Sequence, residues 1–242
     1  MREEGPLERV VCVHGAGGGG WEWGIWARQF AVCGREVLAP DLMPIRAGLA
    51  ATRLADYRAQ VAAWCRAPPA GRVELIGASL GGLLALAVAR EVKARALVLG
   101  NPMPPAGFAS PAAASPAVIR WRSGASLRGT QRAMPDAEDA ACAFAFRRWR
   151  DESGAALDEA RAGLAVDPPD CPVLVIASEH DRDVPPDASR ALAATLGADF
   201  ECIRGASHVG PLLGYSAART AARVVDWLDA RAAHATSMRL LV

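Results

Sequence analysis

The sequence has almost no net charge and no run of residues suited to a membrane or a polyanion. Its 27 lysines and arginines against 26 aspartates and glutamates give a formal net charge of +1 at pH 7. Balanced charge supplies no field that would hold nucleic acid or an anionic membrane surface. No stretch approaches the length of a membrane span, and residues 1–15 lack the sustained apolar run of a signal peptide. We therefore expect no nucleic-acid partner, no membrane span and no leader.

The cysteines lack the spacing of a metal site or a disulfide framework. No C-x-x-C pair occurs, and several cysteines stand among valine, leucine and alanine. The six are Cys12, Cys33, Cys65, Cys142, Cys171 and Cys202. Reduced and mostly packed thiols are typical of cytoplasmic proteins. The sequence therefore predicts a cytoplasmic protein rather than a disulfide scaffold.

No Gly/Ser linker, charge block or internal repeat divides the 242 residues, so we expect one α/β domain with an insertion. Apolar runs typical of buried strands occupy residues 10–13, 36–39, 73–76, 96–99, 173–177 and 200–203. Helical spacing lies between them, at residues 21–33, 54–66, 80–92 and 217–232. This alternation predicts a mostly parallel sheet with flanking helices, whose strands end at one common edge.

One interval, residues 104–169, interrupts the alternation of strands and helices. It contains no clear strand, while residues 119–127 and 137–150 have helical patterns. The interval is too long for a plain connection, and such insertions often form lids over active sites. We predict a helical cap inserted between core segments 1–103 and 170–242. The alternative is a set of extra helices packed on the sheet edge with no role in access.

A serine stands at the junction of a predicted strand and a predicted helix. Residues 77–81 read Gly-Ala-Ser-Leu-Gly, and flanking glycines suit the tight turn that exposes a nucleophile. The helix N-terminus beneath it favours negative charge at the reacting centre. The five-residue pattern alone is weak, but its position between strand and helix predicts that Ser79 is a nucleophile.

A glycine-rich segment follows the first predicted strand. Residues 14–20, here called the glycine loop, read His-Gly-Ala-Gly-Gly-Gly-Gly, and the glycine run lets backbone amides approach a substrate oxygen. We assign an oxyanion hole to the amides of Ala16 and Leu80, with Gly17 as the alternative to Ala16. A phosphate-binding loop would end in Lys-Ser/Thr, but Trp-Glu follows here, which disfavours nucleotide binding.

The loop at residues 205–211, between the last strand and the last long helix, contains the best-placed histidine. This position brings His208 to the same sheet edge as Ser79, as a general base requires. His14 is on the glycine loop, His180 is beside two aspartates, and His234 is in a polar tail.

The triad acid should follow a strand and precede the histidine. Asp181 and Asp183 both follow the strand predicted at residues 173–177, so position alone admits either. Asp183 could instead cap the next helix.

These motifs together resemble the α/β-hydrolase superfamily, and most closely its bacterial lipase-like and esterase-like members. The resemblance spans about residues 10–228 and includes H-G-x-G at 14–17, G-x-S-x-G at 77–81, D-x-x-V-P at 181–185 and G-x-S-H at 205–208. It implies a Ser-His-Asp triad with Asp181 in the acid position and no metal or organic cofactor. Two departures are the missing or reduced first antiparallel strands and an insertion that matches no cap motif tied to a substrate.

The predicted reaction is hydrolysis of a carboxylic ester, lactone or thioester, with a small-molecule acyl substrate as partner. A hydrolase of C–C bonds would use the same triad, and a catalytically inactive binding protein would keep the same pocket. Trp21, Trp23, Phe144 and Trp149 are candidates for the pocket wall, although such aromatic residues also pack helices onto sheets.

Overall fold

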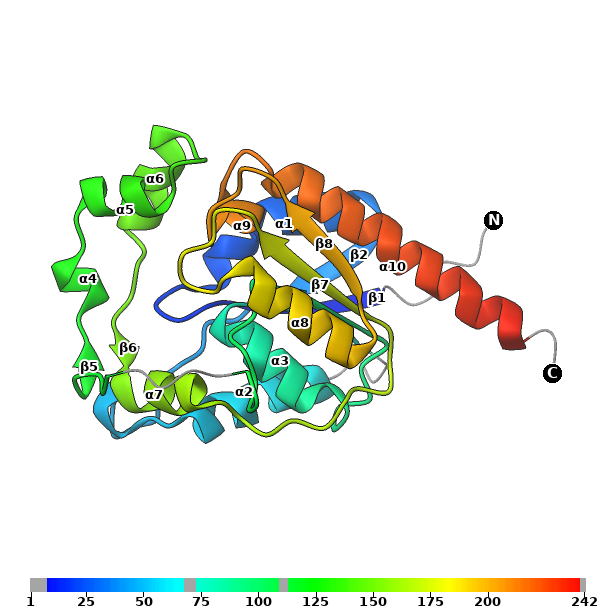
Figure 1. Cartoon of the computed structure of the whole chain (residues 1–242), viewed down its shortest axis with the longest axis horizontal. Coiled ribbons are helices and arrows are strands. Elements are labelled where there is room, and N and C mark those ends of the chain that lie inside the picture. Colours follow the sequence, from blue (N-terminus) through cyan, green and yellow to red (C-terminus); the bar gives the residue numbers. More distant parts are fainter. Residues whose placement is uncertain (1–7, 68–72, 109–112, 240–242) are drawn as a thin grey trace.

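The computed structural model describes residues 8–67, 73–108 and 113–239 and contains a six-stranded parallel sheet (Figure 1). The strand order is β2-β1-β3-β4-β7-β8. The strands are β1 (Glu8–Val13), β2 (Arg35–Leu38), β3 (Glu74–Ala78), β4 (Ala96–Gly100), β7 (Val173–Ser178) and β8 (Asp199–Ile203). All six predicted strands are present, and every pairing between them is parallel. Residues 1–7, to which the expectation of no leader applies, lie outside the described residues.

Helices cover both faces of this sheet, as the sequence predicts. They are α1 (Gly24–Val32), α2 (Leu54–Arg66), α3 (Leu80–Ala89), α8 (Pro186–Leu196), α9 (Gly210–Leu213) and α10 (Ala217–Arg239). The helix predicted at residues 21–33 starts as a 3₁₀ turn, η1 (Gly20–Trp23), and a second 3₁₀ turn is η2 (Leu49–Ala51). No helix in the described ranges is both long enough and apolar enough to cross a bilayer.

Side chains of the central strands point alternately to the two faces of the sheet, and each face has its own hydrophobic core. In β1, Val11 and Val13 join the cluster under α2, α3 and α8, while Val10 and Cys12 join the cluster under α1 and α10. Central strands of a parallel sheet are buried on both faces, which explains why they read as continuous apolar runs rather than as alternating ones. The same arrangement brings the loops after β1, β3, β4, β7 and β8 to the carboxyl edge of the sheet.

The described part of the inserted interval contains four helices and one minimal strand pair. These are β5 (Val118–Ile119), α4 (Trp121–Gly124), α5 (Leu127–Ala133), α6 (Asp139–Phe146), β6 (Glu152–Ser153) and α7 (Gly154–Ala162). The antiparallel pair β5–β6 corrects the expectation of no strand, because two-residue strands leave no periodicity to detect. Figure 1 shows α4, α5 and α6 standing apart from the sheet, while α7 lies beside α2. Residues 109–112 of the interval lie outside the described residues.

Candidate active site

Ser79 occupies a tight turn between β3 and α3 with a backbone conformation that few non-glycine residues adopt. Its φ is 53° and its ψ is −120°. The Ser79 amide donates to the Gly100 carbonyl at 2.9 Å, and the Met103 amide donates to the Ser79 carbonyl at 3.0 Å. A Cβ on Gly77 would overlap the Gly81 carbonyl, and one on Gly81 would overlap backbone oxygens at the end of β1. The surrounding backbone therefore holds the strained turn in place.

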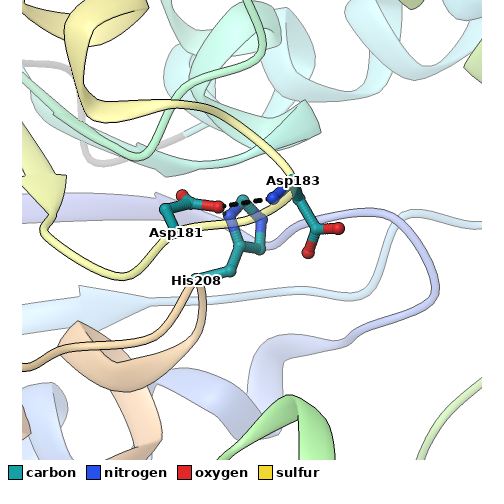
Figure 2. A group of neighbouring side chains, drawn as sticks. All are labelled: Asp181, Asp183 and His208. Atoms are coloured by element: carbon teal, nitrogen blue, oxygen red, sulfur yellow. Dashed lines mark hydrogen bonds and ion pairs between the residues drawn. The ribbon is translucent and has the colours of Figure 1, made fainter.

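His208 and Asp181 form a buried pair at the same edge of the sheet (Figure 2). Imidazole Nδ1 lies 2.7 Å from Asp181 Oδ2, and the Asp181 side chain is fully buried. The other carboxylate oxygen, Oδ1, accepts the amides of Asp183 at 2.8 Å and Val184 at 2.9 Å. Asp183 thus contributes its amide to Asp181, and its side chain is exposed. Nδ1 is engaged by Asp181, so Nε2 is the nitrogen available for proton transfer.

Burial and charge act in opposite directions on the protonation of His208. Burial of the imidazole lowers its pKa, but the hydrogen bond that Nδ1 donates to Asp181 and the charges of Asp181, Asp183 and Glu22 outweigh burial. The net result is a His208 pKa above its ordinary value, as expected for a base whose protonated form is stabilised by a carboxylate.

Asp181, Asp183 and His208 also have the spacing of a metal site, since each offers a ligand atom within 4.8 Å of the others. However, both Asp181 oxygens already accept hydrogen bonds, and a cation at Nδ1 would replace the Asp181–His208 contact. The donor set suits orientation of an imidazole better than coordination of a metal.

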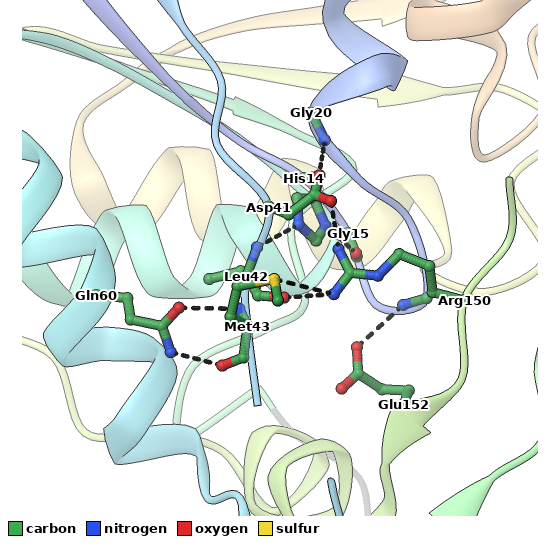
Figure 3. Close-up of polar contacts among 10 residues, drawn as sticks. His14, Gly15, Gly20, Asp41, Leu42, Met43, Gln60, Arg150 and Glu152 are labelled. Atoms are coloured by element: carbon green, nitrogen blue, oxygen red, sulfur yellow. Dashed lines mark hydrogen bonds and ion pairs between the residues drawn. The ribbon is translucent and has the colours of Figure 1, made fainter. Parts of the chain in front are cut away.

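His14 is buried in the loop structure and is not free to act as a base. Its Nε2 accepts the Leu42 amide at 2.8 Å, and its Nδ1 lies 2.7 Å from the Gly15 carbonyl (Figure 3). Burial lowers the His14 pKa to about 4, so the ring is neutral at neutral pH. A neutral ring can accept at Nε2 and donate at Nδ1, which matches both contacts.

The inserted interval holds the glycine loop through two neighbouring residues. Glu152 Oε2 accepts the Gly17 amide at 3.0 Å, and the Arg150 amide donates to the Gly17 carbonyl at 2.8 Å. Tyr57 donates its hydroxyl to Glu152 Oε1 at 2.7 Å. Gly17 has a φ of 67°, and a Cβ there would overlap the Trp121 ring. The Gly17 amide is thus engaged, which leaves the Ala16 amide as the free candidate on this loop.

A second contact of Arg150 holds the far end of the same loop. Its guanidinium lies 3.0 Å from Asp41 Oδ2 and donates to the Leu42 carbonyl at 2.6 Å (Figure 3). Asp41 Oδ1 in turn accepts the Gly20 amide at 2.8 Å. The glycine loop is therefore attached at Gly17 and at Gly20.

The insertion also reaches the loop of His208. Asp136 Oδ2 accepts the Ser207 amide at 3.1 Å, and the Tyr215 amide donates to the Asp136 carbonyl at 2.8 Å. A Cβ on Gly210 would overlap the Asp136 carboxylate. The insertion therefore contacts both loops that flank Ser79.

A cavity of about 960 Å³ is lined by Ser79, His208 and Ala16. Leu80 does not line it: its side chain is buried in the core, while its amide is the first of α3 and belongs to the helix end that lacks intrahelical acceptors. Apolar lining residues include Met103, Phe108, Trp121, Trp149, Leu157 and Leu212.

Of the four aromatic residues predicted for the wall, the structure places Trp149 on the cavity. Trp21 and Phe144 do not line the cavity. The Trp21 ring packs on both Trp149 and Phe144, with centroid distances of 5.2 Å and 5.7 Å. Trp23 is 1% exposed and packs edge-to-face on Trp26. The expectation for Trp23 is thus corrected, because the 3₁₀ turn η1 directs its ring into the core under α1 and α10.

Sequence reasoning missed Asn101, a buried residue at the end of β4. Asn101 Nδ2 donates to the His208 carbonyl at 2.6 Å and to Ser178 Oγ at 2.8 Å, and its Oδ1 accepts the Ser178 amide at 2.7 Å. Its φ is 44°. A polar residue directly after a buried strand was the available signal.

Glu22 is the second residue that sequence reasoning missed. It lines the cavity although the residue is only 4% exposed, and its Oε2 has no hydrogen-bond partner within the described part of the chain. Burial raises the Glu22 pKa to about 8, against the opposing effects of the Gly19 and Gly15 backbone and of His208.

Comparison with known proteins agrees with this architecture. A family model described as alpha/beta hydrolase family matches residues 10–227. Tomato methylketone synthase I complexed with 2-tridecanone has a TM-score of 0.74 at 14% identity, covering 93% of this chain and 99% of that chain. A thermophilic esterase from Thermogutta terrifontis has a TM-score of 0.68 at 20% identity, covering 94% of this chain and 91% of that chain. A pyrethroid hydrolase from Sphingobium faniae has a TM-score of 0.69 at 19% identity, covering 93% of this chain and 99% of that chain. At these identities the likenesses show the fold alone. No curated protein matches the sequence.

Proposed function

The chain belongs to the alpha/beta hydrolase family of enzymes, and we propose that it is a serine hydrolase that cleaves a carboxylic ester, lactone or thioester. The observation that supports this most directly is the arrangement around the cavity. Ser79, on its strained turn, lines the same cavity as His208, whose Nδ1 is held 2.7 Å from the buried Asp181 carboxylate. Each group needed for acyl transfer has a candidate at one sheet edge.

In the proposed first step, Ser79 Oγ attacks the substrate carbonyl carbon while His208 Nε2 removes the hydroxyl proton. Asp181 holds the Nδ1–H tautomer and stabilises the imidazolium that forms. The oxyanion is held by the amides of Ala16 and Leu80. The Gly17 amide is excluded from this role in our proposal because Glu152 accepts it.

Acylation is completed when His208 donates its proton to the departing alcohol or thiol, and the acyl group stays on Ser79. Water then attacks the acyl carbon while His208 removes its proton. The bond between the acyl carbon and Ser79 Oγ breaks, His208 returns the proton to Oγ, and the acid product leaves. The free enzyme is regenerated without any change of oxidation state. All proton transfers pass through Nε2, while Nδ1 remains with Asp181.

We propose that residues 104–169 act as a cap that selects the substrate. The insertion contributes Trp121, Trp149 and Leu157 to the cavity wall. The apolar wall and the cavity of about 960 Å³ suit an acyl substrate with a sizeable apolar body. The structurally similar tomato protein was solved with 2-tridecanone, and the Thermogutta protein is an esterase.

A reducing compartment suits the cysteines, and we propose that the enzyme works in the cytoplasm. Cys12, Cys65 and Cys142 are buried free thiols, and Cys33, Cys171 and Cys202 are also free. Burial raises the pKa of Cys12 and Cys65, which keeps them as unreactive thiols.

The test is covalent labelling by a fluorophosphonate, followed by intact mass, with Ser79→Ala as control. We expect one label on the wild type and none on the variant. A panel of p-nitrophenyl esters and thioesters of graded chain length then defines the acyl group, and Ser79→Ala should lose several orders of magnitude in kcat. Near-normal turnover by Ser79→Ala would refute the proposal. Folded protein that neither labels nor turns over any ester would point to the inactive binding protein.

A further inference from the structure

Glu22 is a buried carboxyl group that the proposed mechanism does not use. Its side chain lies directly over Gly18, where even a Cβ would overlap the carboxylate oxygens. It lines the cavity together with Ser79 and His208, and it is close enough to His208 for its ionised form to raise the pKa of that imidazole. The carboxyl therefore lies beside the reacting atoms.

Backbone groups of Gly19 and Gly15 approach the Glu22 carboxyl, but they leave one of its oxygens unsatisfied. Oε2 is buried without a hydrogen-bond partner within the described residues, and no cation among them faces it other than His208 when that ring is protonated. Leaving a polar group buried and unpaired carries an energetic cost. Such a cost is removed when a ligand in the cavity supplies the missing partner.

We propose that Glu22, as a neutral carboxylic acid, binds a second oxygen of the substrate, and that the enzyme selects acyl substrates with a carbonyl oxygen besides the scissile one. This inference rests on the proposed function, since it assumes that the substrate enters the cavity beside Ser79. A neutral carboxyl donates an O–H bond to such an oxygen. Keto, ester and amide carbonyls all offer the required acceptor, whereas a plain alkyl chain leaves Oε2 unpaired.

Protonation of Glu22 at neutral pH is consistent with the groups around it. Burial is the main cause of its raised pKa, and the negative charge of Asp41 adds to it. The backbone of Gly19 and Gly15 and the charge of His208 oppose the shift without cancelling it. Behind His208 stand Asp181 and Asp183, which face the imidazole. The acid form at neutral pH is the donor that a carbonyl oxygen needs.

The experiment measures binding in Ser79→Ala protein, so that turnover plays no part. Calorimetry compares methyl 3-oxobutyrate with methyl butyrate, which differ by one carbonyl oxygen. We expect Ser79→Ala to prefer the oxo ester roughly 5- to 100-fold. Adding Glu22→Gln, whose amide still donates, should keep the preference, whereas adding Glu22→Leu should abolish it. If the protein with both Ser79→Ala and Glu22→Leu keeps the same preference for the oxo ester as Ser79→Ala, the proposal is overturned. It is also overturned if Ser79→Ala itself binds the two esters equally well.

A pH series keeps the proposal testable even where Glu22→Leu fails to fold. The oxo preference of Ser79→Ala should fall above about pH 8, because the ionised carboxylate can no longer donate. The Glu22→Gln double variant should keep its preference over the same range, which removes any contribution from His208. Identical pH curves for the two proteins would overturn the proposal. Loss of fluorophosphonate labelling in wild type would refute the proposed function separately, because this binding test does not need Ser79.

Discussion

Glu22 makes the stability of this enzyme sensitive to alkali. Its pKa is about 8 in the folded protein against an ordinary value of 4.5, so the folded state binds the proton more tightly than the unfolded chain. The contribution of Glu22 protonation to the free energy of unfolding is therefore fully present below about pH 4.5 and is lost as the pH rises to about 8. Relative to Glu22→Gln, we expect the wild type to lose up to about 4 kcal/mol of unfolding free energy over this range. Urea denaturation at several pH values measures it, and parallel curves for the two proteins would contradict it.

Replacement of the two aspartates after β7, Asp181 and Asp183, should affect kcat to very different extents. Asp181→Asn removes the carboxylate that raises the His208 pKa, so the acid limb of kcat/KM should move to lower pH. Maximal kcat should fall by about three to four orders of magnitude, because the imidazole loses its orienting partner. Asp183→Asn keeps the backbone amide that binds Asp181 and should stay within about tenfold of wild type. The pH–rate profiles of both variants decide the matter, and the reverse ranking would make Asp183 the triad acid.

The order of motifs along the chain is enough to place Ser79 and His208 at one sheet edge, because both follow recognisable strands. The residues alone could not separate Asp181 from Asp183, since the difference lies in how the turn folds Asp183 back toward Asp181 Oδ1. Asn101 stands directly after a buried strand, which is a local signal, but its role comes from contacts with Ser178 and His208 that no local pattern records. Glu22 lies close to the glycine loop in sequence, but nothing in that pattern shows that its carboxyl is buried and faces the cavity.

At the scale of elements, the apolar strands of the sheet were predictable, whereas the insertion was predicted as an interval with helices but not in its internal detail. β5 and β6 have two residues each, which is shorter than any hydrophobic period. The helical pattern at residues 119–127 instead divides between β5 and α4, and α7 was not anticipated. Tertiary hydrogen bonds to the glycine loop, not local preference, determine where β6 lies.

The strand β6 provides the clearest test of an element, through Glu152. Glu152→Ala leaves the Gly17 amide and the Tyr57 hydroxyl without their acceptor. We expect a loss of about 2–4 kcal/mol in stability and a fall of roughly 10- to 100-fold in kcat, because the glycine loop shifts. Tyr57→Phe is the matched control, since it removes one partner and keeps the loop contact, so kcat should change little. Destabilised Glu152→Ala with unchanged kcat would show that the loop does not need this anchor.

Across the whole molecule, burial is distributed very unevenly. The strands β1, β3, β4 and β7 are almost wholly buried, whereas α4 has no buried residue and α5 has only Thr130. Hydrogen exchange should therefore be slowest in the central strands and fastest in α4 and α5, by several orders of magnitude. Mass spectrometry of the exchanged protein measures this. Protection of α4 and α5 equal to that of β3 would mean that the insertion unfolds only with the core.

The attachment of the insertion to two loops restricts how this enzyme can be altered. Arg150 and Glu152 hold the glycine loop, and Asp136 holds the loop of His208. A foreign insertion grafted between β4 and β7 would arrive without these three side chains and would leave both loops unsupported. Exchange of specificity between relatives, by recombination or in the laboratory, therefore succeeds only when the graft and its two receiving loops are transferred as a single inherited unit.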